Sequence, residues 1–251
     1  MSIDISMIGS EKQVRWAESI KAQFAARFPG VPLPQNAYAQ FWIDARDYPL
    51  DRLLEEATKI SSPFTVTYPR YSRADVAPLL RNMGSFAVLD TETTGLTKEA
   101  EIVELAVVTI SGEKLFHSLL LPHDLPAYLK SKARAMHSFS EEAIGAAPTL
   151  PEKWEEIAAI FSLYHPCAYN AAFDFPMIRR SAVAWGIAAP ALSGTCTMKM
   201  FQAFMSSDDP YKLSEACAIM GVEQGIYGVA HTALADALAT AALLRAMRDQ
   251  C

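Results

Sequence analysis

The segment FAVLDTETTGL occupies residues 86–96 and sets four apolar side chains directly before two carboxylates and a glycine turn. The apolar run predicts a buried strand that ends where Asp90 and Glu92 begin. Side chains alternate along a strand, so these two carboxylates project from the same face, about 7 Å apart along the backbone. Two like charges held so close repel each other unless a cation lies between them. The segment therefore predicts a metal site at a strand edge, in preference to an exposed acidic turn.

The composition predicts a globular protein. With 251 residues and 51% hydrophobic content, the chain can form one large domain, or one ordinary domain and a small appendage. Its apolar runs fall far short of the roughly 20 residues needed to span a bilayer, so we expect no membrane partner. The N-terminus has no long apolar core of the secretory type, so we expect a cytoplasmic location.

Charge and cysteine spacing exclude two further classes. The four cysteines lie far apart without a C-x-x-C pair, which argues against a zinc ribbon and against a disulfide framework. The net charge of −6 counts against a protein that binds nucleic acid by bulk electrostatics. It does not exclude a nuclease, because bound divalent cations reverse the local field at an acidic site.

The first third of the chain predicts two segments. Residues 10–13 read Ser-Glu-Lys-Gln, a capping box that opens an amphipathic helix to about Phe28, with further helices expected over 37–45 and 50–60. Residues 1–60 therefore predict a small helical module of unknown role. Residues 61–84 contain several prolines and aromatic residues and predict a linker or irregular packing segment. In it, the cluster around Arg70 and Tyr71 is interpreted as a solvated connector in preference to a nucleic-acid contact.

Residues 85–251 predict an α/β domain. Runs over 85–89, 102–110 and 114–121 predict a three-stranded meander. Helices then follow with short strands between them: a helix from Pro151, a strand over 167–169, a helix over 175–185, an edge strand over 195–198, and helices to Met205, over 212–220 and over 233–247.

Two further carboxylates occupy specific settings. Asp174 closes the run Asn-Ala-Ala-Phe-Asp after a short strand, and Asp236 closes His-Thr-Ala-Leu-Ala-Asp at the start of a helix. His231 and Asp236 can converge only if His231 lies in the loop ahead of that helix, because five helical residues turn through about 140° net. Taken singly, Asp174 could cap a helix and Asp236 could be exposed. Their order after Asp90 and Glu92 favours a shared site.

These ordered motifs resemble the DnaQ-like exonucleases of the DEDDh type, which carry D-x-E-T-T-G, N-x-x-F-D and H-x-x-x-x-D in this order. The resemblance covers about Ser85 to Arg248. It implies a ribonuclease H-like fold, a mixed five-stranded sheet flanked by helices. It also implies metal ligands at Asp90, Glu92, Asp174 and Asp236, with His231 as the general base; all five are catalytic residues on this interpretation.

The implied chemistry fits these residue types. Hard oxygen ligands suit two Mg²⁺ ions, for which Mn²⁺ can substitute, and such a pair can stabilise the attacking and the leaving oxygen of a phosphodiester. The usual pKa of histidine is about 6.5, so a histidine can be neutral at working pH and accept the proton of the attacking water. This is the role that the resemblance implies for His231. Hydrolysis would then release nucleoside monophosphates.

The resemblance also implies a pocket for the terminal nucleotide. Its residues would be Thr93, Gly95, Leu96, Asn170 and Phe173. Leu96 would lie against the base, and backbone groups near Thr93 would reach the sugar. Asn170 would orient the Asp174 loop, and Phe173 could add an apolar wall or belong to the core.

The remaining histidines match none of the motifs. We assign no chemistry to His117, His123, His137 and His165, and interpret them as structural or solvated. Glu104 lies in a strand, and we expect a salt-bridge or surface role for it rather than metal ligation.

The sequence therefore predicts a hydrolase, a metal-dependent 3′-5′ exonuclease that acts on the 3′ ends of single-stranded DNA or RNA. One alternative is a polymerase-associated proofreading or repair component, which would dock a protein partner through residues 1–60. Another is a binding module that grips nucleic-acid ends without turnover. The complete set of carboxylates argues against this second alternative.

Overall fold

The computed structural model describes residues 11–27, 46, 49, 71–97, 99–187, 194–228 and 232–251. The chain divides into two compact units, Met1–Thr67 and Tyr68–Cys251. In the first unit, helix α1 spans Glu11–Arg27 as the capping box predicted, and Ile20 and Phe24 are buried one turn apart. The helices predicted over 37–45 and 50–60 lie outside the described residues, so the helical module of residues 1–60 stays a prediction.

A mixed sheet of five strands forms the centre of the second unit, in the order β3-β2-β1-β4-β5. The strands are β1 Phe86–Thr93, β2 Ile102–Thr109, β3 Lys114–Leu119, β4 His165–Ala168 and β5 Thr195–Cys196. Strands β1, β2 and β3 are antiparallel neighbours, whereas β4 runs parallel to β1 and β5 runs parallel to β4. The predicted meander and the predicted mixed sheet are both confirmed.

Strand β1 continues beyond Leu89, where the sequence predicted its end, and reaches Thr93. Its pairing with β2 continues as far, because Glu92 lies opposite Glu104 before the register shifts between Glu92 and Thr93. An apolar run in the sequence indicates which residues are buried, but it does not show how far the backbone pairs with the next strand. The predicted strand therefore ended at the first acidic residue. The carboxylates of Asp90 and Glu92 are therefore held by the sheet.

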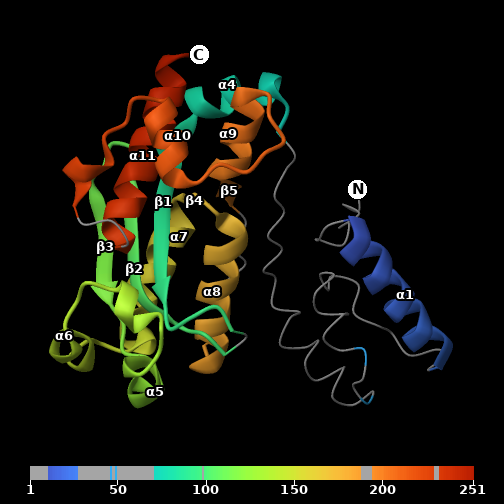
Figure 1. Ribbon diagram of the computed structural model, residues 1–251, viewed down its shortest axis with the longest axis vertical. Helices are drawn as coiled ribbons and strands as arrows, with labels where there is room; N and C mark the ends of the chain where they lie inside the picture. The colour runs from blue at the N-terminus through green and yellow to red at the C-terminus, as the bar shows by residue number, and fades with distance from the viewer. Residues whose placement is uncertain are drawn as a thin grey trace. The chain divides into compact units, whose positions relative to one another are not determined.

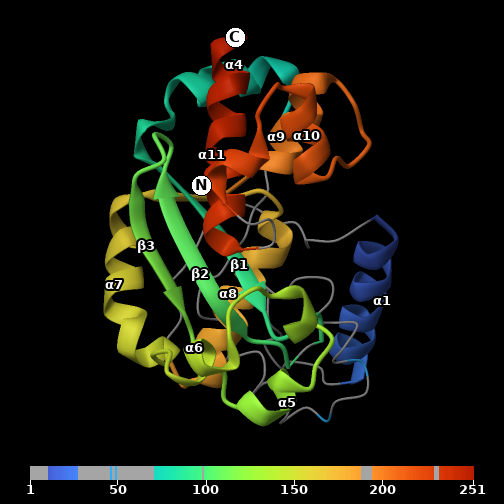
Figure 2. The same cartoon turned by 60° about the vertical axis from the view of Figure 1, so that its left-hand side comes forward.

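The helices of the second unit form two layers around this sheet. They are α4 Arg73–Arg81, α5 Leu125–Leu129, α6 Glu141–Gly145, α7 Leu150–Leu163, α8 Ala171–Ala184, α9 Thr197–Met205, α10 Leu213–Ile219 and α11 Ala233–Asp249. Helix α11 lies across one face, against β1 and β2, whereas α7 and α8 lie on the other face (Figure 1, Figure 2). The alanines of α11 that face the sheet are buried, and their small side chains allow the helix to approach β1 closely.

Part of the expected linker is helical. The sequence predicted a linker or irregular packing over residues 61–84, but residues 73–81 form α4, whose Val76 and Leu80 are buried in the main core. The backbone N–H of Ser72 and its hydroxyl both donate to Asp75, which caps the helix. Pro78 lies inside this helix, where a proline removes one backbone hydrogen bond, and burial of the apolar face outweighs that loss. The domain boundaries themselves stay predictions.

Within the described part of the chain, none of the helices is both long enough and apolar enough to cross a membrane.

Candidate active site

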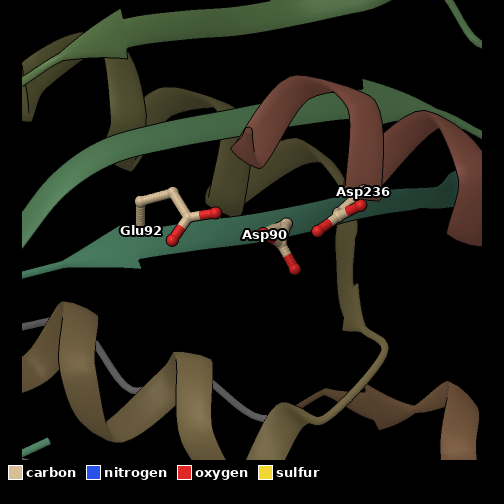
Figure 3. Close-up of side chains that lie close together, drawn as sticks. All are labelled: Asp90, Glu92 and Asp236. Carbon is tan, nitrogen blue, oxygen red and sulfur yellow. The ribbon is translucent and has the colours of Figure 1, made fainter. Parts of the chain in front are cut away.

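Three carboxylates from two distant elements meet between β1 and α11. Asp90 and Glu92 share one face of β1, as alternation predicted, and Asp236 lies in the first turn of α11. Figure 3 shows Asp90 between Glu92 and Asp236. One oxygen from each of the three lies within 4.8 Å of the others. Hard oxygen ligands at this spacing fit a divalent cation such as Mg²⁺ or Mn²⁺.

The electrostatics of the cluster favour a cation. Burial raises the pKa of Asp90 well above its ordinary value, and the negative charges of Asp174, Asp236 and Glu92 raise it further. A carboxyl that its surroundings discourage from ionising gains most from a positive charge nearby. The first turn of α11 also favours the negative charge of Asp236, because the N-terminal end of a helix is electropositive.

Asp174 lies on the α8 side of β1 and is not among the three carboxylates within 4.8 Å. Its Oδ1 accepts hydrogen bonds from the Thr91 backbone N–H at 3.1 Å and from the Thr91 hydroxyl at 2.8 Å. Burial raises its pKa to about 7, although the hydrogen bonds from Thr91 lower it and the charge of Glu92 adds to the rise. Asp174 therefore lies close enough to influence Asp90, and β1 holds it through Thr91.

Helix α8 begins earlier than the sequence predicted. It starts at Ala171 with Asn170 as its N-cap, so Asp174 lies in the first helical turn and not ahead of the helix. The carbonyl of Asn170 accepts the backbone N–H groups of Phe173 and Asp174, which closes that turn. The expected helix began at the apolar residues after Asp174, but a first helical turn needs no apolar face. Phe173 is half-buried, which leaves both of its predicted roles open.

The N-terminus of α11 is fixed to the sheet. Thr232 is its N-cap and accepts the Ala235 N–H at 3.3 Å. Glu104 of β2 accepts the Ala233 N–H through Oε2 at 3.1 Å and contacts His117 Nε2 through Oε1 at 2.7 Å. Glu104 pairs with His117, as the expected salt-bridge role requires, whereas a surface role is wrong, because the side chain is buried. Glu104 thus anchors the helix that carries Asp236.

The predicted general base, His231, lies outside the described residues. Helix α11 begins at Ala233 with Thr232 as its N-cap, as the prediction that residue 231 precedes the helix requires. Its role as a base stays a prediction.

The predicted nucleotide pocket begins directly after the predicted metal ligands on β1. The Thr93 hydroxyl donates to the Gly95 carbonyl at 2.8 Å, which closes the turn that follows the strand. Leu96 is 84% exposed, so its side chain is available to a ligand. Their role in nucleotide binding stays a prediction.

Sequence reasoning missed the contact that His137 makes with the site. His137 is buried, and its Nε2 lies 3.2 Å from Oε2 of Glu92. We assigned His137 no chemistry because it matched none of the motifs. The partner of a buried histidine can lie anywhere in the chain, so no spacing rule identifies this pair. The available signal was weaker, since a histidine needs a polar partner when it is buried, but the sequence does not show that His137 is buried.

The family of this chain is shown by a comparison with known protein families. The RNase T family model, described as Exonuclease, matches residues 87–244 and thereby covers the sheet, α8 and most of α11. The chain belongs to the RNase T/DnaQ-like DEDDh exonuclease family. The prediction of a hydrolase with 3′-5′ exonuclease activity is confirmed at the level of this family.

Two curated relatives of this exonuclease family can be named. The uncharacterized exonuclease CP81 of Escherichia phage 186 is 30% identical over 172 residues, which cover 63% of this chain and 86% of the phage protein. The 3′-5′ exonuclease DinG of Staphylococcus saprophyticus is 28% identical over 164 residues, again 63% of this chain but 17% of the staphylococcal protein.

A solved exonuclease structure supports the fold. The nuclease domain of 3′hExo, a DEDDh family member bound to rAMP, superposes with a TM-score of 0.51 at 14% identity. The match covers 68% of this chain and 94% of that domain. At this identity the likeness establishes the ribonuclease H-like fold alone.

Proposed function

We propose that this exonuclease removes nucleotides one at a time from the 3′ end of single-stranded DNA or RNA. In this proposal Asp90, Glu92, Asp174 and Asp236 hold two divalent cations, and His231 acts as the general base. The observation that carries it is the meeting of three carboxylates from β1 and α11 with oxygens within 4.8 Å. The name of the staphylococcal relative, a 3′-5′ exonuclease, supports the direction of degradation.

The carboxylates have separate tasks in this proposal. Asp90 is central because both Glu92 and Asp236 lie beside it and the charge of Asp174 acts on it (Figure 3). Asp174 is oriented by its two hydrogen bonds from Thr91, which direct the carboxylate from α8 toward β1. The bound cations would supply the positive charge that assists ionisation of the attacking water and stabilises the departing 3′ oxygen.

The remaining predicted residues would handle the proton and the nucleotide. His231 would accept a proton from the attacking water through its imidazole. The exposed Leu96 supports a contact with the terminal base, because a solvated apolar side chain can stack against it. The closed turn at Thr93 and Gly95 supports a rigid backbone edge for the sugar.

The test is to incubate single-stranded DNA, duplex DNA and RNA, each labelled at the 5′ end, with the protein and Mg²⁺, and then with a chelator. We expect a ladder that shortens from the 3′ end, that needs Mg²⁺ and that forms fastest on single strands. Asp90→Asn should reduce the rate by about 10³-fold or more, because metal assistance contributes several kcal/mol. Asp209→Asn, at an exposed carboxyl between α9 and α10, is the matched control. Degradation in the chelator, or shortening from the 5′ end, would contradict the proposal.

A further inference from the structure

A chain of close polar contacts leads from the interior of the protein to Glu92. The Tyr128 hydroxyl lies 2.6 Å from Nδ1 of His137, and Nε2 of His137 lies 3.2 Å from Oε2 of Glu92. Tyr128 belongs to α5 and Glu92 to β1, and His137 lies between α5 and α6. Three residues from different segments therefore meet in sequence, ending at the carboxylate of Glu92.

The chemistry of the three groups indicates which atoms carry the hydrogens. The carboxylate of Glu92 can only accept, so its contact with Nε2 of His137 is favourable when Nε2 carries the hydrogen. A neutral imidazole then has a lone pair on Nδ1, which accepts the hydroxyl hydrogen of Tyr128. The tyrosine thus favours the tautomer of His137 that presents its Nε2–H to Glu92. A metal-binding histidine would need a free ring nitrogen, whereas both nitrogens of His137 are engaged here.

The imidazole is held rigidly. Its ring stacks on Phe139, with centroids 5.2 Å apart, and the Arg134 guanidinium donates to the His137 carbonyl at 3.0 Å. Tyr128 is buried with Val103 of β2 and Ile144 of α6 in a small core of its own. The segment that carries His137 is therefore fastened to β2, the strand that pairs with β1.

The geometry points to His137 and Tyr128 as positioning residues for the metal ligand Glu92. A glutamate side chain has three rotatable bonds, and only a few of its conformations bring an oxygen within 4.8 Å of those of Asp90 and Asp236. A fixed donor on Oε2 selects one such conformation before a cation arrives. Partners of this kind orient metal ligands, and their loss typically weakens metal binding by about 10- to 100-fold. This inference rests on the proposed metal-dependent function.

The test measures Mn²⁺ affinity by calorimetry on the full chain without nucleic acid, alongside Mg²⁺-dependent degradation of single-stranded DNA. His137→Leu should weaken Mn²⁺ binding by about 10-fold or more, and His137→Gln, whose amide can donate near the position of Nε2, should recover most of the loss. The kcat at low Mg²⁺ should fall with the affinity, whereas the KM for the oligonucleotide should change less than about twofold.

Tyr128→Phe removes only the hydroxyl and isolates its part. It should weaken Mn²⁺ binding by a smaller factor, about 3-fold, and leave the fold intact. The matched control is Tyr71→Phe, since burial raises the pKa of both tyrosines to about 12 and the Tyr71 hydroxyl is bonded to Thr195, away from the metal cluster. Tyr71→Phe should bind Mn²⁺ as the unchanged protein does.

Two results would overturn the inference. The first is wild-type Mn²⁺ affinity in a folded His137→Leu variant. The second is an equal loss of affinity in His137→Leu and His137→Gln, since that would reflect packing alone. The inference and the proposed function fail separately: an unchanged protein whose Mn²⁺ affinity depends on His137 but which does not degrade DNA refutes only the function. An active enzyme that binds Mn²⁺ normally without His137 refutes only the inference.

Discussion

Two glutamates face each other across β1 and β2, and each contacts a histidine. Glu92 lies opposite Glu104, with His137 beside the first and His117 beside the second. The burial of the two pairs is reversed. The side chain of Glu104 is 4% exposed and its histidine 30%, whereas the side chain of Glu92 is 18% exposed and its histidine 4%.

This difference separates a structural anchor, Glu104, from the proposed metal ligand Glu92. Both oxygens of Glu104 are satisfied by the protein, one by His117 and the other by the Ala233 N–H of α11. Glu92 receives its histidine on Oε2 and belongs to the carboxylate cluster with Asp90. A buried carboxylate whose two oxygens both have partners within the protein has a structural role. A carboxylate that contacts the protein through one oxygen and lies beside other carboxylates is suited to binding a cation. Neighbouring positions of one sheet thus acquire different tasks from what surrounds them.

Substitution of the two glutamates should change exonuclease activity to very different extents. Glu92→Gln should reduce exonuclease activity by about 10²-fold or more and weaken Mn²⁺ binding, because it removes a charged ligand. Glu104→Gln keeps an oxygen for the Ala233 N–H and should retain activity within about 3-fold. Rates at saturating Mg²⁺ and Mn²⁺ titrations check both variants. Equal losses in the two would show that the division between anchor and ligand is wrong.

For the free energy of unfolding we expect the opposite order, with the larger loss at Glu104 and the smaller at Glu92. Glu104→Ala leaves the Ala233 N–H and His117 without their buried partner, and should lower the free energy of unfolding by about 2–4 kcal/mol. Glu92→Ala should cost the metal-free protein about 1 kcal/mol or less, since it also relieves repulsion among like charges. Urea denaturation in a chelator gives both values. The comparison would lose its physical basis if Glu92→Ala proved the more damaging change.

Asp174 combines features of both glutamates, because it is buried like Glu104 and its charge adds to burial in raising the pKa of Asp90 in the carboxylate cluster. Its pKa is raised from 3.8 to about 7, so across that range the folded state binds a proton that the unfolded state has released. The contribution of this group to stability therefore falls as the pH rises through that window. Asp174→Asn lacks the group, so its Tm relative to the unchanged protein should increase between these pH values in a chelator. A difference in Tm that stays constant with pH would refute this.

A substitution at Thr91, which donates two hydrogen bonds to Asp174, should have a small effect on stability and metal binding. Thr91→Val removes the hydroxyl hydrogen bond to Asp174 but keeps the one from the backbone N–H. We expect a loss of about 1 kcal/mol in the free energy of unfolding, and a few-fold weaker metal binding at neutral pH because the pKa of Asp174 rises further. Thr91→Ser, which keeps a hydroxyl, serves as the control. An unaltered Mn²⁺ affinity in Thr91→Val would exclude an orienting role for the hydroxyl.

The sequence was sufficient for the features that depend on local pattern. Alternation along β1 placed Asp90 and Glu92 on one face, and the apolar runs located all five strands of the sheet to within a few residues. The ordered motifs also predicted that Asp236 lies with these two carboxylates. These successes share one cause, since each depends on residues that are close together in sequence or on motifs with a fixed order.

What the sequence missed depends on contacts between distant segments. Helix α4 is stabilised by burial of Val76 and Leu80 against elements far along the chain, which outweighs the proline that favoured a linker. The roles of Glu104 and His137 likewise come from partners on other elements. A buried polar side chain is informative only once its partner is known, and no periodicity supplies that partner.

Helix α11 contributes Asp236 from a position well over a hundred residues beyond β1. During synthesis, a nascent chain that has reached Met220 already carries Asp90 and Glu92 but still lacks the helix that brings the third carboxylate beside them. At about 5–20 residues per second, the three carboxylates therefore come together only seconds after the sheet has emerged.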